Sequence, residues 1–185
     1  MTEIEEKIIQ AAIRTFIRYG AKKTSMTDIA SAAGVSRQTL YDLFGNKDEL
    51  IVTSIRYVTR ESLTTVQRKL VGITKLADKL DVYFEETIVK SFELLQSSGD
   101  PEDLISGHNK AGKAAIKEAH KQHEAVIAEI LMAEASQRTY QGQTVAQLAH
   151  FFVTTAMGFK SGATSRSDLD GLIKSLKTAI AAIIE

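Results

Sequence analysis

The chain has 185 residues, of which 44% are hydrophobic, and its 23 basic and 23 acidic side chains give a formal net charge of zero. It contains no cysteine, which excludes disulfide bonds, thiolate metal sites and a cysteine nucleophile. No apolar run is long enough to span a bilayer and no stretch has the pattern of a secretory signal, so we expect a cytoplasmic protein with no membrane partner.

The composition favours an all-α fold. There is a single proline, and no stretch alternates between apolar and polar residues as a strand does, whereas residues of high helix propensity are abundant. The length suits a small amino-terminal domain followed by a larger helical lobe.

A first helix is expected between Thr2 and Gly20. Thr2 and Glu5 form a capping box, which satisfies backbone N–H groups at a helix start. Apolar side chains then recur every fourth residue from Ile8 to Phe16, which is the spacing of one buried helix face.

Two short helices joined by a tight turn are predicted over residues 25–44. Ser25 and Asp28 form a second capping-box-like pair, and Ser36 is the natural N-cap of the second helix. Gly34 tolerates the positive φ that a sharp turn requires. The apolar positions would then face inward together, at Ile29, Ala30, Ala33, Val35, Leu40 and Leu43. This is the helix-turn-helix pattern.

The second of these helices presents polar side chains outward. Arginine pairs with guanine and glutamine with adenine in the major groove, and hydroxyl groups reach phosphate oxygens. Side chains of these kinds stand at Arg37, Gln38, Thr39 and Tyr41. An ordinary solvated helix face is the alternative. Residues 14–47 nevertheless hold six basic side chains against two acidic ones, which favours a basic surface beside DNA.

The amino-terminal third of the chain resembles the DNA-binding domain of the tetracycline-repressor (TetR) family. The resemblance rests on the run T-S-M-T-D-I-A-S-A-A-G-V-S-R-Q-T-L-Y-D-L-F-G-N-K-D-E-L and on the preceding I-I-Q-A-A-I-R-T-F-I-R-Y-G. The glycine turn, the T-L-Y core, the phenylalanine and the N-K-D-E-L cap all fall in register. Asp42-Leu43 departs from the pattern, because many members have an aromatic residue or histidine there. Asp42 would repel phosphate and is assigned no contact.

The resemblance implies a DNA-binding domain over residues 1–46, with its helix-turn-helix motif at residues 25–44. It implies a helical effector-binding and dimerisation domain over residues 47–185. The side chains that it implies in contact with an operator are Ser25, Thr27, Ser36, Arg37, Gln38, Thr39, Tyr41 and Lys47.

A long helix is expected to begin after Gly45, where Asn46 and Glu49 form a capping box. The free N–H groups and the dipole at a helix start attract an anion, and Lys47 adds a full charge. We therefore expect Lys47 to contact a phosphate, with an ordinary surface lysine as the alternative. The helix continues to about Gly72, and in the TetR family it is the lever that connects the two domains.

The remaining chain is predicted to form helices separated by short breaks. A helix capped by Thr74 runs to about Ser97, and Asp100-Pro101 begins a short helix that ends near Gly107. An alanine-rich helical stretch covers residues 109–137 and a loop covers residues 138–143. Two further helices cover residues 144–162 and the residues from Ser167 onward, where Ser167 and Asp170 form the cap.

These last two helices carry more apolar surface than one small lobe needs, which indicates a partner. In the TetR family the corresponding helices pair with those of a second copy of the chain. The predicted homodimer interface consists of Leu148, Phe152, Ala156, Phe159, Leu169, Leu172, Ile173, Leu176 and Ile180.

An effector pocket is expected among the middle helices, where aromatic or adaptable side chains fall on faces that we expect to point inward. The candidates are Tyr83, Phe84, Ile88, Phe92, His123, Met132 and Phe152. The alternative is that each of these side chains fills the core.

We predict a TetR-type transcriptional regulator, a repressor that binds a palindromic operator as a homodimer and is released by a small-molecule inducer, without a cofactor or catalytic residues. One alternative is a DNA-binding dimer that needs no ligand. Another is a metal-dependent enzyme that uses His108, His120, His123 and His150. His120 and His123 lie three residues apart and would hold a metal if a third ligand joined them. No nucleophile elbow, phosphate loop or His-Glu metal motif supports this enzyme.

Overall fold

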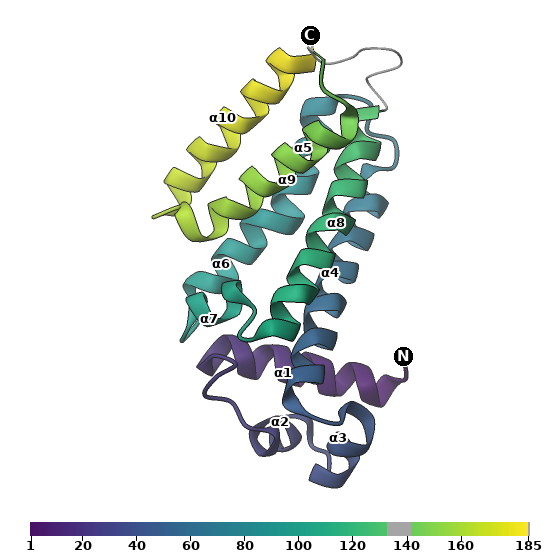
Figure 1. Ribbon diagram of the computed structural model, residues 1–185, viewed down its shortest axis with the longest axis vertical. Helices are drawn as coiled ribbons and strands as arrows, with labels where there is room; N and C mark the ends of the chain where they lie inside the picture. Colours follow the sequence, from purple (N-terminus) through teal and green to yellow (C-terminus); the bar gives the residue numbers. More distant parts are fainter. Residues whose placement is uncertain (133–141, 185) are drawn as a thin grey trace. The chain divides into compact units, whose positions relative to one another are not determined.

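A computed structural model describes residues 1–132 and 142–184, and helices are the regular elements of these ranges (Figure 1). They are α1 (Glu3–Tyr19), α2 (Met26–Ala33), α3 (Arg37–Phe44), α4 (Lys47–Leu70), α5 (Leu76–Phe84), the π-helical segment η1 (Glu85–Val89), α6 (Lys90–Gln96), α7 (Pro101–Ser106), α8 (Lys110–Met132), α9 (Val145–Gly162) and α10 (Arg166–Ile184). The predicted all-α fold is confirmed. The helix end predicted near Gln137 and most of the loop predicted at residues 138–143 fall outside the described residues.

The chain divides into two compact units. Unit 1 consists of residues 1–60 and 94–119, and unit 2 consists of residues 61–93 and 120–185. Helices α4 and α8 therefore contribute residues to both units. The domain boundary predicted at residue 46 lies where α4 begins, and that functional division stays a prediction.

The amino-terminal helices share one hydrophobic core in unit 1. Helix α1 lies across α2 and α3 (Figure 1), and the capping box of Thr2 and Glu5 is present at its start. The predicted periodicity holds, because Ile8 and Phe16 are buried. The other buried members of this core include Ile9, Ala11, Ala12, Met26, Ile29, Ala30, Ala33, Leu40, Phe44, Leu50 and Ile51.

One inward position of the helix-turn-helix was predicted wrongly. Leu43 is 39% exposed, and Phe44 is buried in its place. Residues four apart lie on the same side of a helix. In the two turns of α3 the buried side therefore runs from Leu40 to Phe44, and Leu43 lies beside it.

Unit 2 has a core of its own, in which α9 and α10 form an antiparallel hairpin (Figure 1). Aromatic rings occupy its centre. The ring centroid of Tyr83 lies 6.0 Å from that of Phe84 and 5.7 Å from that of Phe152, both in edge-to-face geometry. Such pairs add to the burial energy of the rings, so they stabilise the packing of α5 against α9.

The helix predicted from Thr74 to Ser97 begins later than expected and is not a regular α-helix. Its N-cap is Lys75, which makes no side-chain cap hydrogen bond, so Thr74 is not the cap. The π-helical turn η1 joins α5 to α6 without a break, and within it the Thr87 hydroxyl donates to the Tyr83 carbonyl over 2.7 Å. Turns of this kind occur often at functional sites.

The start of α10 also differs from the prediction. The helix begins at Arg166, and the Ser165 hydroxyl accepts a hydrogen bond from the Asp168 N–H over 3.1 Å. Ser165 therefore caps the helix in place of Ser167. Within the described ranges, no helix has both the length and the apolar character needed to cross a bilayer.

The apolar stripe predicted as a dimer interface lies inside unit 2. All its residues are buried except Leu172, which is half-buried and packs against the same core. This prediction was wrong, because helical periodicity identifies the apolar side of a helix but not whether that side meets its own chain or a partner. The outward sides of α9 and α10 carry Phe151, which is 46% exposed, and small residues such as Gly158 and Gly171.

Candidate nucleic-acid interface

The turn between α2 and α3 is built as predicted. The Ser25 hydroxyl accepts from the Asp28 N–H over 3.2 Å, and the Asp28 carboxylate accepts from the Ser25 N–H over 2.8 Å. Hydrogen bonds from the Ser25 hydroxyl and N–H lower the pKa of Asp28. Gly34 has a φ of 64°, in the left-handed region that glycine adopts without steric cost. These features fix the direction in which α3 leaves the turn.

Helix α3 exposes its first turn while its middle is anchored. The Ser36 hydroxyl accepts from the Thr39 N–H over 3.0 Å and caps the helix. Leu40 is fully buried, whereas Arg37 and Gln38 are exposed. The helix therefore presents a guanidinium and an amide, two groups that hydrogen-bond to base edges in the major groove.

The other side chains predicted to contact an operator are placed less uniformly. Tyr41 is 41% exposed and Thr27 is exposed, whereas Thr39 is half-buried. The hydroxyls of Ser36 and Thr39 lie 2.8 Å apart, so both take part in the cap of α3. Their contacts with DNA stay a prediction, as do those of Ser25, Thr27 and Tyr41.

Asp42, which had no assigned role, holds the side chain of Gln38. The Gln38 amide donates from Nε2 to Asp42 Oδ1 over 2.7 Å, four residues along the helix. This bond orients the amide, so that its carbonyl oxygen remains free to accept from a base amino group. Sequence spacing contained this signal, because residues four apart on a helix face one another.

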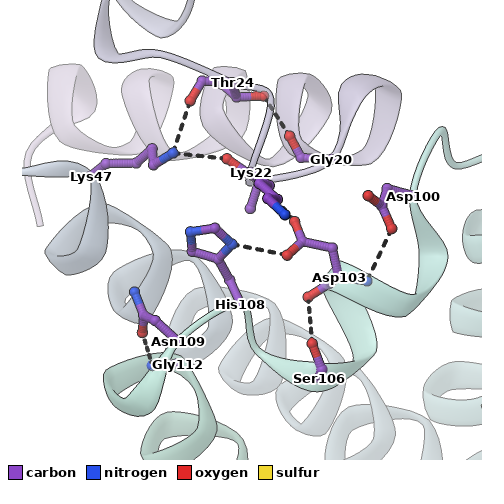
Figure 2. A network of polar contacts seen from close by, with 11 residues as sticks. Gly20, Lys22, Thr24, Lys47, Asp100, Asp103, Ser106, His108, Asn109 and Gly112 are labelled. Atoms are coloured by element: carbon purple, nitrogen blue, oxygen red, sulfur yellow. Dashed lines mark hydrogen bonds and ion pairs between the residues drawn. The ribbon is translucent and has the colours of Figure 1, made fainter.

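Lys47 has a structural role that sequence reasoning missed. Its Nζ donates to the carbonyl oxygens of Ala21 and Thr24 over 3.0 and 3.1 Å (Figure 2). The ammonium thus ties the start of α4 to the loop between α1 and α2. Its third N–H remains for a phosphate, so the predicted contact stays a prediction. Asn46 caps α4 as predicted, by accepting from the Glu49 N–H over 3.0 Å.

A second polar link in unit 1 involves Asp103 of α7 (Figure 2). Its carboxylate accepts from the backbone N–H of Lys22 over 2.8 Å and lies 2.9 Å from Nδ1 of His108. Burial alone would raise the pKa of Asp103, but the hydrogen bonds with His108 and the Lys22 N–H lower it. The α1–α2 loop is therefore fastened from α4 and from α7. No local sequence pattern pointed to these contacts.

An open groove of about 780 Å³ runs along α1 and α2 within unit 1. Arg14, Arg18 and Lys23 line it, together with Asp28. The Arg18 guanidinium lies 5.1 Å from the centroid of the Tyr19 ring, in cation–π geometry. These cations belong to the segment whose positive charge was noted in the sequence.

The predicted effector-pocket residues are mostly buried in the core of unit 2. They include the adjoining rings described above, and Ile88, Phe92 and His123 are buried as well. Met132 is 61% exposed at the end of α8, so its predicted inward placement was wrong. The packing agrees with side chains that fill the core, and their part in a pocket stays a prediction.

The histidines are dispersed rather than gathered. His108 is bonded to Asp103, His123 lies 3.0 Å from the Tyr83 hydroxyl, and His150 lies 2.8 Å from Glu124. Among the described residues no three side chains are grouped in a way that would hold a metal ion. The arrangement therefore gives the metal-dependent enzyme no support.

The sequence matches known proteins most clearly over the helix-turn-helix region. Residues 8–53 match the family described as bacterial regulatory proteins, tetR family. The chain is 32% identical over 84 residues to YvdT of Bacillus subtilis, an uncharacterised HTH-type transcriptional regulator, with 45% of this chain and 43% of that protein covered. It is 45% identical over 49 residues to the HTH-type transcriptional regulator TtgR of Pseudomonas putida, with 26% and 23% covered. The matched part therefore spans less than half the length of these relatives.

Solved structures share the fold over nearly the whole chain. The fatty acid degradation regulator FadR from Bacillus halodurans has a TM-score of 0.73 at 18% identity, with 100% of this chain and 96% of that chain covered. A TetR transcriptional regulator from Legionella pneumophila has a TM-score of 0.75 at 13% identity, with 97% and 98% covered. These proteins are transcriptional regulators rather than enzymes. The chain therefore carries the DNA-binding domain of the tetR family at its amino-terminal end and has the fold of TetR-family regulators.

Proposed function

We propose that the protein is a homodimeric repressor that reads a palindromic operator through α3 and leaves it when a small molecule binds in unit 2. The observation that carries this proposal is the first turn of α3, which exposes Arg37 and Gln38 while Leu40 anchors the helix in the core. Sequence is read by groups of this kind at base edges, and phosphate contacts position the protein.

Dimerisation follows from the size of the reading element. Helix α3 has eight residues, and one such helix makes too few base contacts for the affinities typical of specific binding. Two copies related by a twofold axis read two half-sites in successive turns of the major groove. An operator for this protein is therefore expected to be a palindrome.

The exposed sides of α9 and α10 are the surface that we propose for the dimer. Phe151 offers apolar area, and a Cβ added at Gly158 or Gly171 would meet nothing within 4 Å. Small residues let two helix backbones approach closely, and helices from two protomers form four-helix bundles in this way. This surface replaces the buried stripe that sequence periodicity indicated.

Helix α4 is the element that we propose to connect effector binding to DNA release. It contributes Leu50 and Ile51 to the core of unit 1, and Leu63 and Val66 to the core of unit 2. A helix packed into two cores couples them, because a shift that repacks one end also loads the other. Lys47 at its start holds the α1–α2 loop, so movement of α4 would also displace that loop.

Selection from randomised double-stranded DNA tests this function. The full-length protein should enrich a palindrome whose half-sites are separated by about one helical turn, roughly 34 Å. A variant with both Arg37→Ala and Gln38→Ala should enrich no common motif, while Lys117→Ala, at an exposed position on α8, should behave like the wild type. Enrichment of the same motif by the double variant would show that α3 does not read the sequence.

A further inference from the structure

Lys160 is a cation without an acidic partner in unit 2. It is half-buried on α9, one residue after the buried Phe159. An amine taken out of water loses hydration energy, and that loss is ordinarily offset by a carboxylate. The charged groups around Lys160 therefore indicate whether this protein supplies one.

The described acidic groups of unit 2 do not provide that partner. Only Glu86 and Glu124 are buried or half-buried among them. Glu86 is paired with Lys69 over 2.6 Å and with Lys90 over 2.5 Å, and Glu124 is paired with His150 over 2.8 Å. The charges near the core are thus matched except at Lys160. Burial lowers the pKa of Lys160 to about 8, so at neutral pH it is still mainly an ammonium ion.

Two histidines of α8 lie within the electrostatic reach of Lys160. His123 is 5% exposed, and its Nδ1 lies 3.0 Å from the Tyr83 hydroxyl. Burial first, and then the charge of Lys160, lower the pKa of His123 to about 3, and the same two causes lower that of half-buried His120. Both rings are therefore neutral, and neutral imidazoles can each donate one N–H.

The tautomer of His123 follows from its partner. Burial raises the pKa of Tyr83, which keeps the phenol protonated and able to donate to Nδ1. The ring proton of His123 then resides on Nε2, where it is a donor. One full positive charge and neutral imidazole donors thus come from two facing helices, beside the aromatic rings of the unit 2 core.

We propose that Lys160, with His120 and His123 beside it, binds the carboxylate of a small organic acid whose apolar part lies against the aromatic core, and that this acid is the effector. A monoanion fits one unpaired ammonium, whereas a phosphate dianion would leave a second charge unmatched. Binding restores the missing partner, which is the source of the affinity. This inference rests on the proposed function, because it names the chemical class of the inducer.

Calorimetric titration of the full-length protein tests the proposal with two matched series of probes. One series is the straight-chain carboxylates from butanoate to dodecanoate, and the other is the alcohols of equal chain length. We expect the wild type to bind at least one acid about tenfold or more tightly than its alcohol, as a charge-assisted hydrogen bond implies. Lys160→Met should abolish this preference, and Lys160→Arg should keep most of it.

Lys121→Met is the matched control, because it removes a positive charge at an exposed position of α8 next to His120. It should retain the wild-type preference for the acid. The proposal is overturned if no acid binds the wild type, if acid and alcohol bind equally, or if Lys160→Met keeps the preference.

Binding of each variant to operator DNA without any probe separates this inference from the proposed function. Lys160→Met should bind the operator as the wild type does and should not be released by the acid that releases the wild type. Loss of operator binding by the wild type itself would contradict the regulator. Normal operator binding with release by an alcohol, and not by an acid, would contradict the carboxylate site alone.

Discussion

At the scale of single residues, the unpaired ammonium of Lys160 has a measurable cost. Its pKa is lowered by burial to about 8 from the ordinary 10.5, so the folded state disfavours the charged form. The destabilisation is complete at pH values below about 8 and is relieved as the pH rises from 8 to 10.5. A residue of this kind weakens the fold unless a ligand supplies the missing charge.

We therefore expect Lys160→Met to stabilise the protein. At pH 7 the free energy of unfolding should rise by about 1–3 kcal/mol, since each unit of pKa shift corresponds to about 1.4 kcal/mol and half-burial reduces the effect. Urea denaturation at pH 7 measures the change, and exposed Lys121→Met should alter it little. A Lys160→Met protein less stable than the wild type would mean that the ammonium is satisfied in the folded chain.

His123 makes the stability depend on acidity. Its folded-state pKa is about 3, compared with 6.5 for a free side chain, so below pH 6.5 the unfolded chain binds more protons than the folded one. Stability should then fall as the pH falls, by up to about 1.4 kcal/mol per pH unit. His120 has the same sign of shift and adds to this slope.

His123→Gln should flatten that dependence between pH 6.5 and 5, because the group that titrates on unfolding is gone. Urea denaturation at several pH values in this window gives the slope for each protein. The variant loses a buried aromatic contact and starts from a lower stability, so the slope rather than the absolute value is compared. An unchanged slope would show that His123 is not the responsible group.

At the scale of elements, the starts of α4 and of the α1–α2 loop depend on each other through Lys47. Its two hydrogen bonds to the carbonyls of Ala21 and Thr24 are charge-assisted and partly buried, and bonds to charged groups contribute about 1.5–3 kcal/mol. Lys47→Met should therefore lower the free energy of unfolding by about that amount, as well as weakening binding to every DNA sequence.

Exposed Lys23 provides the control for this prediction. Lys23→Met removes a charge from the same loop without these two bonds, so it should change DNA affinity and leave stability nearly unaffected. Equal stability of Lys47→Met and the wild type in urea would restore the simpler view, in which Lys47 only contacts phosphate.

Much of the element structure could be predicted from local signals. The capping pairs at Ser25 and Asn46 and the glycine at Gly34 mark helix ends, because they satisfy backbone groups or tolerate a conformation that other residues avoid. The π-helical turn at residues 85–89 has no such signal. The contacts of Lys47 and Asp103 join segments far apart in sequence, so spacing alone contains no record of them.

The faces of α9 and α10 show a different limit. Periodicity separated the apolar side, with Leu148 and Phe152, from the side with Phe151 and Gly158. Whether an apolar side meets its own chain or a partner depends on the tertiary fold, because both arrangements bury the same area. The family resemblance led to the wrong choice here. For α3 the resemblance and the residue chemistry agreed on Arg37 and Gln38, which are exposed.

At the scale of the whole molecule, DNA reading requires two copies joined by the outward sides of α9 and α10. Gly158→Trp should produce monomers, since an indole at a position where a Cβ meets nothing within 4 Å leaves the chain's own core intact and blocks close helix packing between copies. Sedimentation velocity measures the change. Ala114→Trp, at an exposed position of α8, should remain dimeric. A dimeric Gly158→Trp protein would place the interface elsewhere.

The most direct test of the regulator is the ratio of affinities for the selected palindrome and for scrambled DNA, measured by fluorescence anisotropy at one fixed salt concentration. The wild type should prefer the palindrome by about a thousandfold or more. Arg37→Ala should reduce the ratio by about tenfold or more, as loss of a bidentate base contact implies, with little change on scrambled DNA. A ratio near one for the wild type, or equal losses on both DNAs for Arg37→Ala, would contradict sequence reading by α3.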